Sequence, residues 1–291
     1  MRMKLCMTVL LAWLVFCGNT VAAVVPRIEV NPDGKGLKLL VFEGSDHHRN
    51  YVDRGKILGD LYFNYLVDNK TYSVKLSDLQ SEILENTAGK IQIFWQLPAG
   101  VRLYQTFTVS GEEIEWDIEF FNRSHHTVNI LDMCLTVPIG AIDESVQACQ
   151  NLNRHFSLNG NSSFLYWIPY TGQGDILLMS MKKGTAMEYA TWDGKYYLHA
   201  TNVVDRASDT WRIPSTSKTV APYQRYLTGF NFTVAKDHTD LRGKLYDKGN
   251  VLVKVAPGMV VTPEMEVYCA LQTQLPVEQL TVECPEQIKV A

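Results

Sequence analysis

The chain has 291 residues, of which 46% are hydrophobic and 20% are charged. This composition is typical of a folded protein with a large core, and it excludes a disordered tail and a miniprotein held together by disulfides alone. The formal net charge is -4. An acidic chain is a poor match for nucleic acid, because binding to phosphates normally requires clustered Lys and Arg.

The N-terminal segment predicts export. A basic start precedes an apolar run over residues 5–16, and the small residues at 20–23 offer a cleavage site, which is the pattern of a secretory signal peptide. We expect residues 1–23 to be removed and residues 24–291 to form one domain, in the periplasm or secreted. The apolar run is shorter than the roughly 20 residues of a spanning helix, so we expect no transmembrane segment.

The middle of the chain shows the two-residue periodicity of β-strands. Hydrophobic and polar residues alternate over 91–97 and 113–120, and a strand over 101–109 fits between them. These residues predict a three-stranded meander in which Trp116 faces the core. Further β-rich runs are bounded by Gly, Pro or Asn: 128–137, 175–181, 195–200, 226–235, 251–255 and 266–271.

Helical patterns are scarce. The best candidate runs from Thr239 to Lys248, with Thr239 as a possible N-cap and Gly249 as the C-terminal stop, while residues 77–85 are ambiguous. About a dozen strands with one or two short helices and no βαβ alternation predict an all-β fold. We expect a large β-sandwich of two antiparallel sheets.

The mature chain would contain four cysteines. Cys134, Cys149, Cys269 and Cys284 form an even set, and disulfides persist in exported proteins. Pairing of sequence neighbours, 134 with 149 and 269 with 284, is one of three connectivities; buried unpaired thiols are the alternative. None of the four has the spacing of a metal ligand, so no metal site is predicted.

Five segments carry a resemblance to a known family. They are Gly59–Leu61, Glu115–Asn122, Trp167–Gly174, Gly184–Tyr189 and Val253–Val261. Together they resemble the N-terminal supersandwich domain of DUF5695-type proteins, which are exported bacterial proteins related in architecture to glycoside hydrolases and polysaccharide lyases. The resemblance covers residues 35–275 and implies a galactose-mutarotase-like sandwich.

In such proteins the sandwich leads into a toroid of α-helices that supplies much of the catalytic cleft. The present chain stops at Ala291, close to where the sandwich should end. The resemblance therefore implies an apolar surface that binds a separate helical-toroid protein or a second copy of the chain. It also implies that the chain alone does not turn over polysaccharides.

Candidate glycan-binding residues lie mostly in the second half of the chain. Sugar sites combine aromatic faces, which pack on the apolar side of a pyranose, with polar groups that bind its hydroxyls. A polar stretch near the N-terminus offers further groups able to bind a carboxylate. The predicted glycan-binding residues are Trp167, Tyr170, Glu188, Trp192, Trp211, His47 and Arg49.

Catalytic residues are less clearly marked. A mutarotase-like reaction needs a general acid and a general base, and His155 with Glu188 is the pair to test first. The sequence has no GxSxG, HExxH or P-loop motif, so no cofactor is expected. We therefore expect an exported carbohydrate-associated domain that binds glycan or assists a polysaccharide-processing system.

Two alternatives remain open. One is a stand-alone sugar-active enzyme, similar to an aldose 1-epimerase or a glycosidase, which needs a convergent acid/base pair. The other is a structural envelope or adhesion domain without a small-molecule ligand.

Overall fold

The computed structural model describes most of the region predicted to be mature. The described residues are 23–46, 49–142, 144, 147–191, 194–202, 216–258, 260, 262, 264–279 and 281. The predictions made for the signal peptide and for His47, Trp192, Trp211 and Cys284 lie outside them.

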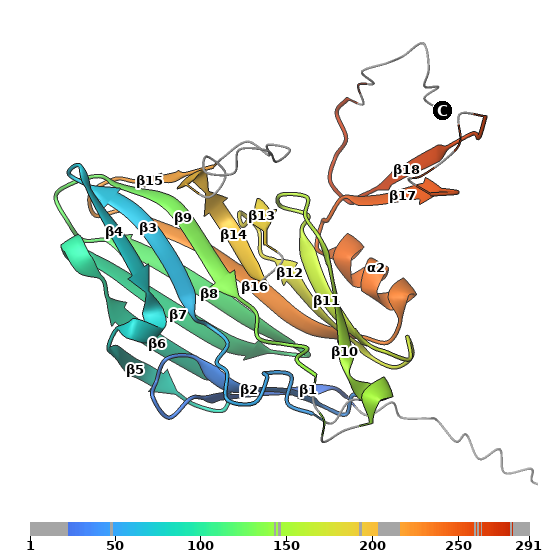
Figure 1. Cartoon of the computed structure of the whole chain (residues 1–291), viewed down its shortest axis with the longest axis horizontal. Coiled ribbons are helices and arrows are strands. Elements are labelled where there is room, and N and C mark those ends of the chain that lie inside the picture. Colours follow the sequence, from blue (N-terminus) through green and yellow to red (C-terminus); the bar gives the residue numbers. More distant parts are fainter. Residues whose placement is uncertain are drawn as a thin grey trace, which may run out of the picture.

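Two antiparallel sheets form the body of the protein (Figure 1). The 8-stranded sheet has the order β10-β11-β12-β16-β8-β7-β6-β5. Its strands are β5 (Ser81–Asn86), β6 (Lys90–Gln96), β7 (Val101–Ser110), β8 (Glu113–Asn122), β10 (Leu152–Ser157), β11 (Phe164–Pro169), β12 (Ile176–Met181) and β16 (Arg225–Ala235).

The second sheet has 6 strands in the order β13-β14-β9-β3-β4, with β15 also paired to β9. Its strands are β3 (Leu61–Val67), β4 (Lys70–Lys75), β9 (Val128–Thr136), β13 (Tyr189–Ala190), β14 (Lys195–Ala200) and β15 (Lys218–Val220). The prediction of a large antiparallel β-sandwich is confirmed.

Three short 3₁₀ helices connect strands among the described residues: η1 (Leu76–Asp78), η2 (Pro98–Gly100) and η3 (Ala148–Gln150).

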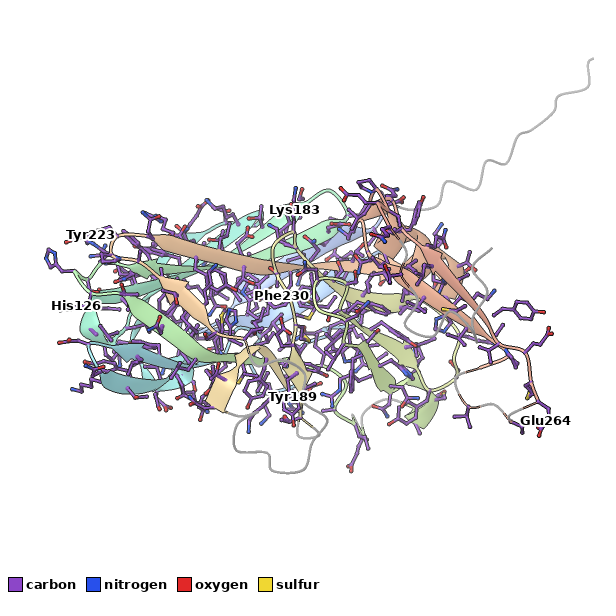
Figure 2. The ribbon with its side chains drawn as sticks, turned by 90° about the horizontal axis from the view of Figure 1, so that it is seen from above. His126, Lys183, Tyr189, Tyr223, Phe230 and Glu264 are labelled. Atoms are coloured by element: carbon purple, nitrogen blue, oxygen red, sulfur yellow. The ribbon has the colours of Figure 1, made fainter. Side chains whose placement is uncertain are left out.

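The main core lies between the two sheets and follows from strand alternation. In β8, Ile114, Trp116, Ile118 and Phe120 are completely buried, while the acidic residues between them face outward. The predicted meander is confirmed as β6, β7 and β8, and Trp116 is a core residue. Phe230 of the long strand β16 lies in the middle of the molecule (Figure 2).

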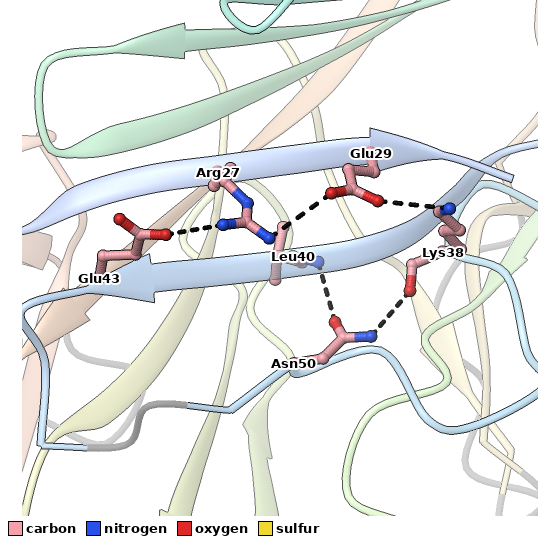
Figure 3. A network of polar contacts seen from close by, with 6 residues as sticks. All are labelled: Arg27, Glu29, Lys38, Leu40, Glu43 and Asn50. Atoms are coloured by element: carbon pink, nitrogen blue, oxygen red, sulfur yellow. Dashed lines mark hydrogen bonds and ion pairs between the residues drawn. The ribbon is translucent and has the colours of Figure 1, made fainter.

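A hairpin of β1 (Val25–Val30) and β2 (Leu37–Glu43) adds to this core. On its exposed side, Arg27 bridges Glu43 and Glu29, and Glu29 also pairs with Lys38 (Figure 3). The Asn50 side chain accepts from the Leu40 N–H and donates to the Lys38 carbonyl, which ties the next segment to β2 (Figure 3). Because the ion pairs are exposed, they contribute little stability.

A smaller second core lies on the outer face of the 8-stranded sheet. It forms where α2 (His238–Asp247) packs over β12 and β16, with Leu241 and Leu245 buried. The helix begins at Asp237, whose side chain accepts from the Asp240 N–H, so the predicted N-cap at Thr239 is wrong by two residues. Gly249 ends it with a positive φ of 80°, as predicted.

The chain continues into a hairpin of β17 (Leu252–Ala256) and β18 (Tyr268–Gln272), which projects from the sandwich beyond α2 (Figure 1). Exposed apolar side chains gather in this region, including Tyr268, Leu271 and Val277. The expected contact with a helical partner or a second copy stays a prediction. Among the described residues, no helix has the length and apolarity that crossing a bilayer requires.

Two other expectations are settled by local structure. The ambiguous segment 77–85 divides into the end of η1 and most of β5. The predicted disulfide between Cys134 and Cys149 is wrong: Cys134 is buried on β9 among Tyr197 and Ala200, whereas Cys149 is an exposed thiol in η3. Cys269 is an exposed thiol on β18, and its predicted partner lies outside the described residues.

Candidate functional site

A large cleft opens at the end of the sandwich where β9 ends and β3 and β14 begin. Its volume is about 940 Å³. It is lined by two loops, by the ends of strands of the 6-stranded sheet, and by the edge strand β10 of the other sheet. The lining residues are Asp53, Gly55, Lys56, Ile57, Asp60, Tyr62, Lys75, Ser77, Thr136, Val137, Pro138, Ile139, Gly140, Ala141, Leu152, Asn153, Arg154, Tyr170, Gly194 and Lys195.

The cleft continues onto the outer face of the 6-stranded sheet. In β3, Leu61, Phe63 and Tyr65 point into the main core, so Tyr62 and Asn64 between them point away from it. A second cavity of about 170 Å³ lies on this face and shares Tyr62 and Lys195 with the cleft. The two cavities therefore meet at these side chains.

Two exposed aromatic rings line the cleft. Tyr62 on β3 is 42% exposed, and Tyr170, just after β11, is 48% exposed. Such half-exposed rings can pack on the apolar face of a sugar while their hydroxyls remain in water. The placement of Tyr170 in the cleft fits its predicted glycan-binding role; Tyr62 was not predicted.

Asp53 holds one wall of the cleft in place. One carboxylate oxygen accepts hydrogen bonds from the backbone N–H groups of Gly140 (3.1 Å) and Ala141 (3.0 Å). Burial raises the pKa of Asp53, and these two hydrogen bonds oppose that shift. The Asp53 N–H also donates to the Pro138 carbonyl, so this residue joins the two loops that line the cleft.

Asp60 has a similar local role. Its Oδ1 accepts from the Ser77 N–H at 3.0 Å, and its Oδ2 lies 3.7 Å from Lys75 Nζ. The remaining charged lining residues are cations: Lys56, Arg154 and Lys195. Arg154 lies over the ring of the buried Tyr196, with its guanidinium carbon 5.7 Å from the ring centroid.

The smaller cavity has a buried carboxylate at its base. Asp132 Oδ2 accepts from the side-chain amides of Asn64 and Asn202, both at 2.8 Å, and its Oδ1 accepts from the Asn202 N–H at 2.9 Å. These contacts satisfy both oxygens, so Asp132 anchors the residues that follow β14 to the sheet.

Trp167 does not bind glycan directly. Its ring is completely buried in the main core, so the predicted stacking on sugar is corrected. Its Nε1–H donates to the Ile139 carbonyl at 2.9 Å, and the ring lies against Gly140. Trp167 therefore supports the cleft loop from beneath.

The remaining predicted residues do not converge. Arg49 donates to the Gln150 carbonyl and is not among the cleft residues. His155 stacks on Tyr166 at 4.8 Å, on the side of the 8-stranded sheet that carries α2. Glu188 instead lies near Tyr226, which packs against the main core, and burial raises the pKa of Glu188. The predicted acid/base pair of His155 and Glu188 is therefore not brought together.

A different titratable pair occurs at the edge between the sheets. His199 Nε2 lies 3.0 Å from the hydroxyl of Tyr226, and its Nδ1 lies 3.3 Å from the hydroxyl of Thr216. Burial, aided by Lys218, lowers the pKa of His199 to about 4, so the imidazole is neutral at pH 7. No local pattern in the sequence joins these two residues, since they lie on β14 and β16 and meet only across the sandwich. Neither residue is among those that line the cleft.

No protein-family model matches the sequence, and no curated protein matches it. Among solved structures, it is similar to a polysaccharide lyase, with a TM-score of 0.62, 15% sequence identity, and coverage of 80% of this chain and 35% of the lyase. The present chain thus spans about a third of the length of that protein.

Two further structures show weaker similarity. A galactose mutarotase related enzyme from Lactobacillus acidophilus has a TM-score of 0.44 and 9% identity, over 75% of this chain and 97% of the enzyme. A GH36 alpha-galactosidase from Geobacillus stearothermophilus has a TM-score of 0.43 and 11% identity, over 78% and 42% of the two chains. At these identities the comparisons bear on fold alone, and the likeness to the lyase agrees with the β-sandwich described above.

Proposed function

We propose that the protein is an exported, carbohydrate-binding β-sandwich that assists a polysaccharide-processing system, and that its glycan lies in the cleft at the ends of β3, β9 and β14. The observation that carries this proposal is the combination of exposed Tyr62 and Tyr170 with numerous polar groups in one cleft of about 940 Å³. A cleft of this size, with rings and polar groups together, suits an oligosaccharide better than a flat protein partner.

The carbohydrate-related names of the similar structures support the same proposal, as does the resemblance to DUF5695-type supersandwich domains. In this proposal the domain corresponds to the galactose-mutarotase-like sandwich of such proteins. The N-terminal signal pattern supports export to the periplasm or beyond.

Glycan-array binding of the purified chain tests the proposal, followed by titration of a responsive glycan with variants. Tyr62→Ala and Tyr170→Ala should each weaken binding by about 1–3 kcal/mol, the usual loss for an aromatic anchor. The control is Tyr223→Ala, because Tyr223 is also exposed but lies at the end of the molecule near His126 (Figure 2). It should leave affinity unchanged.

Binding to no glycan would refute the proposal and favour a structural or adhesion role. Binding that neither cleft tyrosine affects would move the site elsewhere. Thermal unfolding of each variant separates lost binding from lost folding, since both rings are half-exposed and their removal should change stability little.

The alternative of a stand-alone sugar-active enzyme is favoured by one observation, the hydrogen bond between His199 and Tyr226. A neutral imidazole beside a phenol can accept and donate protons. Turnover of a sugar substrate that disappears in both His199→Gln and Tyr226→Phe would support the enzyme. We expect no such turnover, because the pair lies outside the residues that line the cleft.

A further inference from the structure

The cleft differs in charge from the chain as a whole. The full sequence has a formal net charge of -4, yet the cleft is lined by four basic residues, Lys56, Lys75, Arg154 and Lys195, and by two acidic ones, Asp53 and Asp60. These side chains come from the loop between β2 and β3 and from strands of both sheets, so the fold gathers positive charge here from separate parts of an acidic sequence.

The two carboxylates are already engaged by the protein. Asp53 accepts from two backbone N–H groups, and Asp60 accepts from a third and pairs with Lys75. They therefore stabilise the cleft walls. The charged groups that remain to bind a ligand in the cleft are therefore the cations.

Two of the cations are available to such a ligand. Lys56 and Arg154 are both exposed, and neither lies within ion-pair distance of a carboxylate that the structure describes, although the charge of Lys56 acts to lower the pKa of Asp53. Arg154 lies over the Tyr196 ring and beside Gly194, and its guanidinium donates to no residue that the structure describes. A planar guanidinium offers paired N–H donors that match a carboxylate or a sulfate.

We infer that the cleft selects sugars that carry a negative charge, with Arg154 and Lys56 contacting the anionic group and with Tyr62 and Tyr170 contacting the sugar rings. This inference rests on the proposed function and adds the chemical class of the ligand. The anionic group is a carboxylate, as in a uronic acid, or a sulfate ester, because both present oxygens that accept from the same donors.

The experiment compares matched pairs of oligosaccharides by calorimetric titration of the full chain. One pair is a uronic acid oligomer and the same oligomer with its carboxylates reduced to alcohols; the other is a sulfated galactan oligomer and its desulfated form. We expect at least one charged member to bind about tenfold tighter than its neutral counterpart, as several charge-assisted hydrogen bonds would give. The pair that responds identifies the anionic group.

Charge-removing variants locate the effect. Arg154→Gln and Lys56→Gln should each weaken binding of the charged oligomer by about threefold to tenfold, the range for partly exposed charged contacts. Binding of the neutral form should weaken less, because it lacks the anionic group, so each variant should narrow the ratio of the two affinities. The matched control is Lys183→Gln, because Lys183 is also an exposed lysine. Tyr189 packs on the outer face of the 6-stranded sheet, onto which the cleft continues. Lys183 lies on the opposite side of the molecule from Tyr189 (Figure 2).

Each outcome is decisive. Equal affinity for charged and neutral members of both pairs overturns this inference but leaves glycan binding in the cleft intact. A preference for charge that survives in both cleft variants places the anion elsewhere and also overturns it. Failure of every oligomer on the array and in titration overturns the proposed function itself, and the inference with it.

Discussion

Gln105 links the main core to the cleft, and its replacement should cost the protein considerable stability. This amide on β7 is completely buried. Its Nε2 donates to the Gly59 carbonyl at 2.7 Å, and its Oε1 accepts from Trp116 Nε1 at 2.9 Å. Gly59 immediately precedes Asp60 of the cleft wall, so one side chain joins β7, β8 and the loop before β3.

Gln105→Leu keeps a similar volume but removes both hydrogen bonds. It leaves the Trp116 N–H and the Gly59 carbonyl buried without a partner, and each such group costs about 1–3 kcal/mol. The leucine adds buried apolar surface that offsets about 1 kcal/mol. The expected net loss is therefore about 1–5 kcal/mol of unfolding free energy.

Urea unfolding followed by tryptophan fluorescence measures this loss as a lower midpoint at unchanged slope. The control is Gln92→Leu on the outer face of β6, where the amide donates to Thr106 at 3.1 Å and is only partly buried. That change should cost less than about 1 kcal/mol. If the two variants unfold at the same urea concentration, the buried amide does not have the role argued for it.

Three other substitutions test the core and its edge. Trp167→Ala should lower the unfolding free energy by about 3–5 kcal/mol, because it removes a buried ring; a melting temperature close to that of the parent would show that the ring is not core. His199 has a folded pKa of about 4 and an unfolded pKa of about 6.5, so stability should fall by at most about 3 kcal/mol as the pH drops through that window. In denaturant titrations His199→Gln should flatten this dependence, and an equal slope would contradict it. Gly229→Ala would place a Cβ 2.5 Å from the Trp116 carbonyl oxygen, so the paired strands must shift, and calorimetry should show a lower melting temperature.

The strands could be predicted where one face is buried and the other is exposed. The alternation in β8 shows both the strand and its inward residues. In β12, by contrast, all six residues are buried, because α2 covers the outer face of the sheet there. Such a run reveals a strand but not which face meets which core.

The candidate site could be predicted only in part. Trp167 lies two residues after Leu165 on β11, a spacing that places both on one face, and this signal could have identified the tryptophan as core. Tyr170 follows the end of that strand and is exposed. Lys56 and Arg154 are far apart in sequence and meet only because a loop lies beside the edge strand β10, which no local pattern reveals.

The anchoring of Asn202 by Asp132 has a consequence for protein engineering. Just before that residue, the Ala200 N–H and the Thr201 hydroxyl both donate to the Thr216 carbonyl, at 3.3 and 3.1 Å. Residues 200–202 and Thr216 are thus held side by side by bonds among described residues. Because a change of chain length between fixed ends costs little free energy, replacement of residues 203–215 by recognition segments of other lengths should leave the sandwich folded.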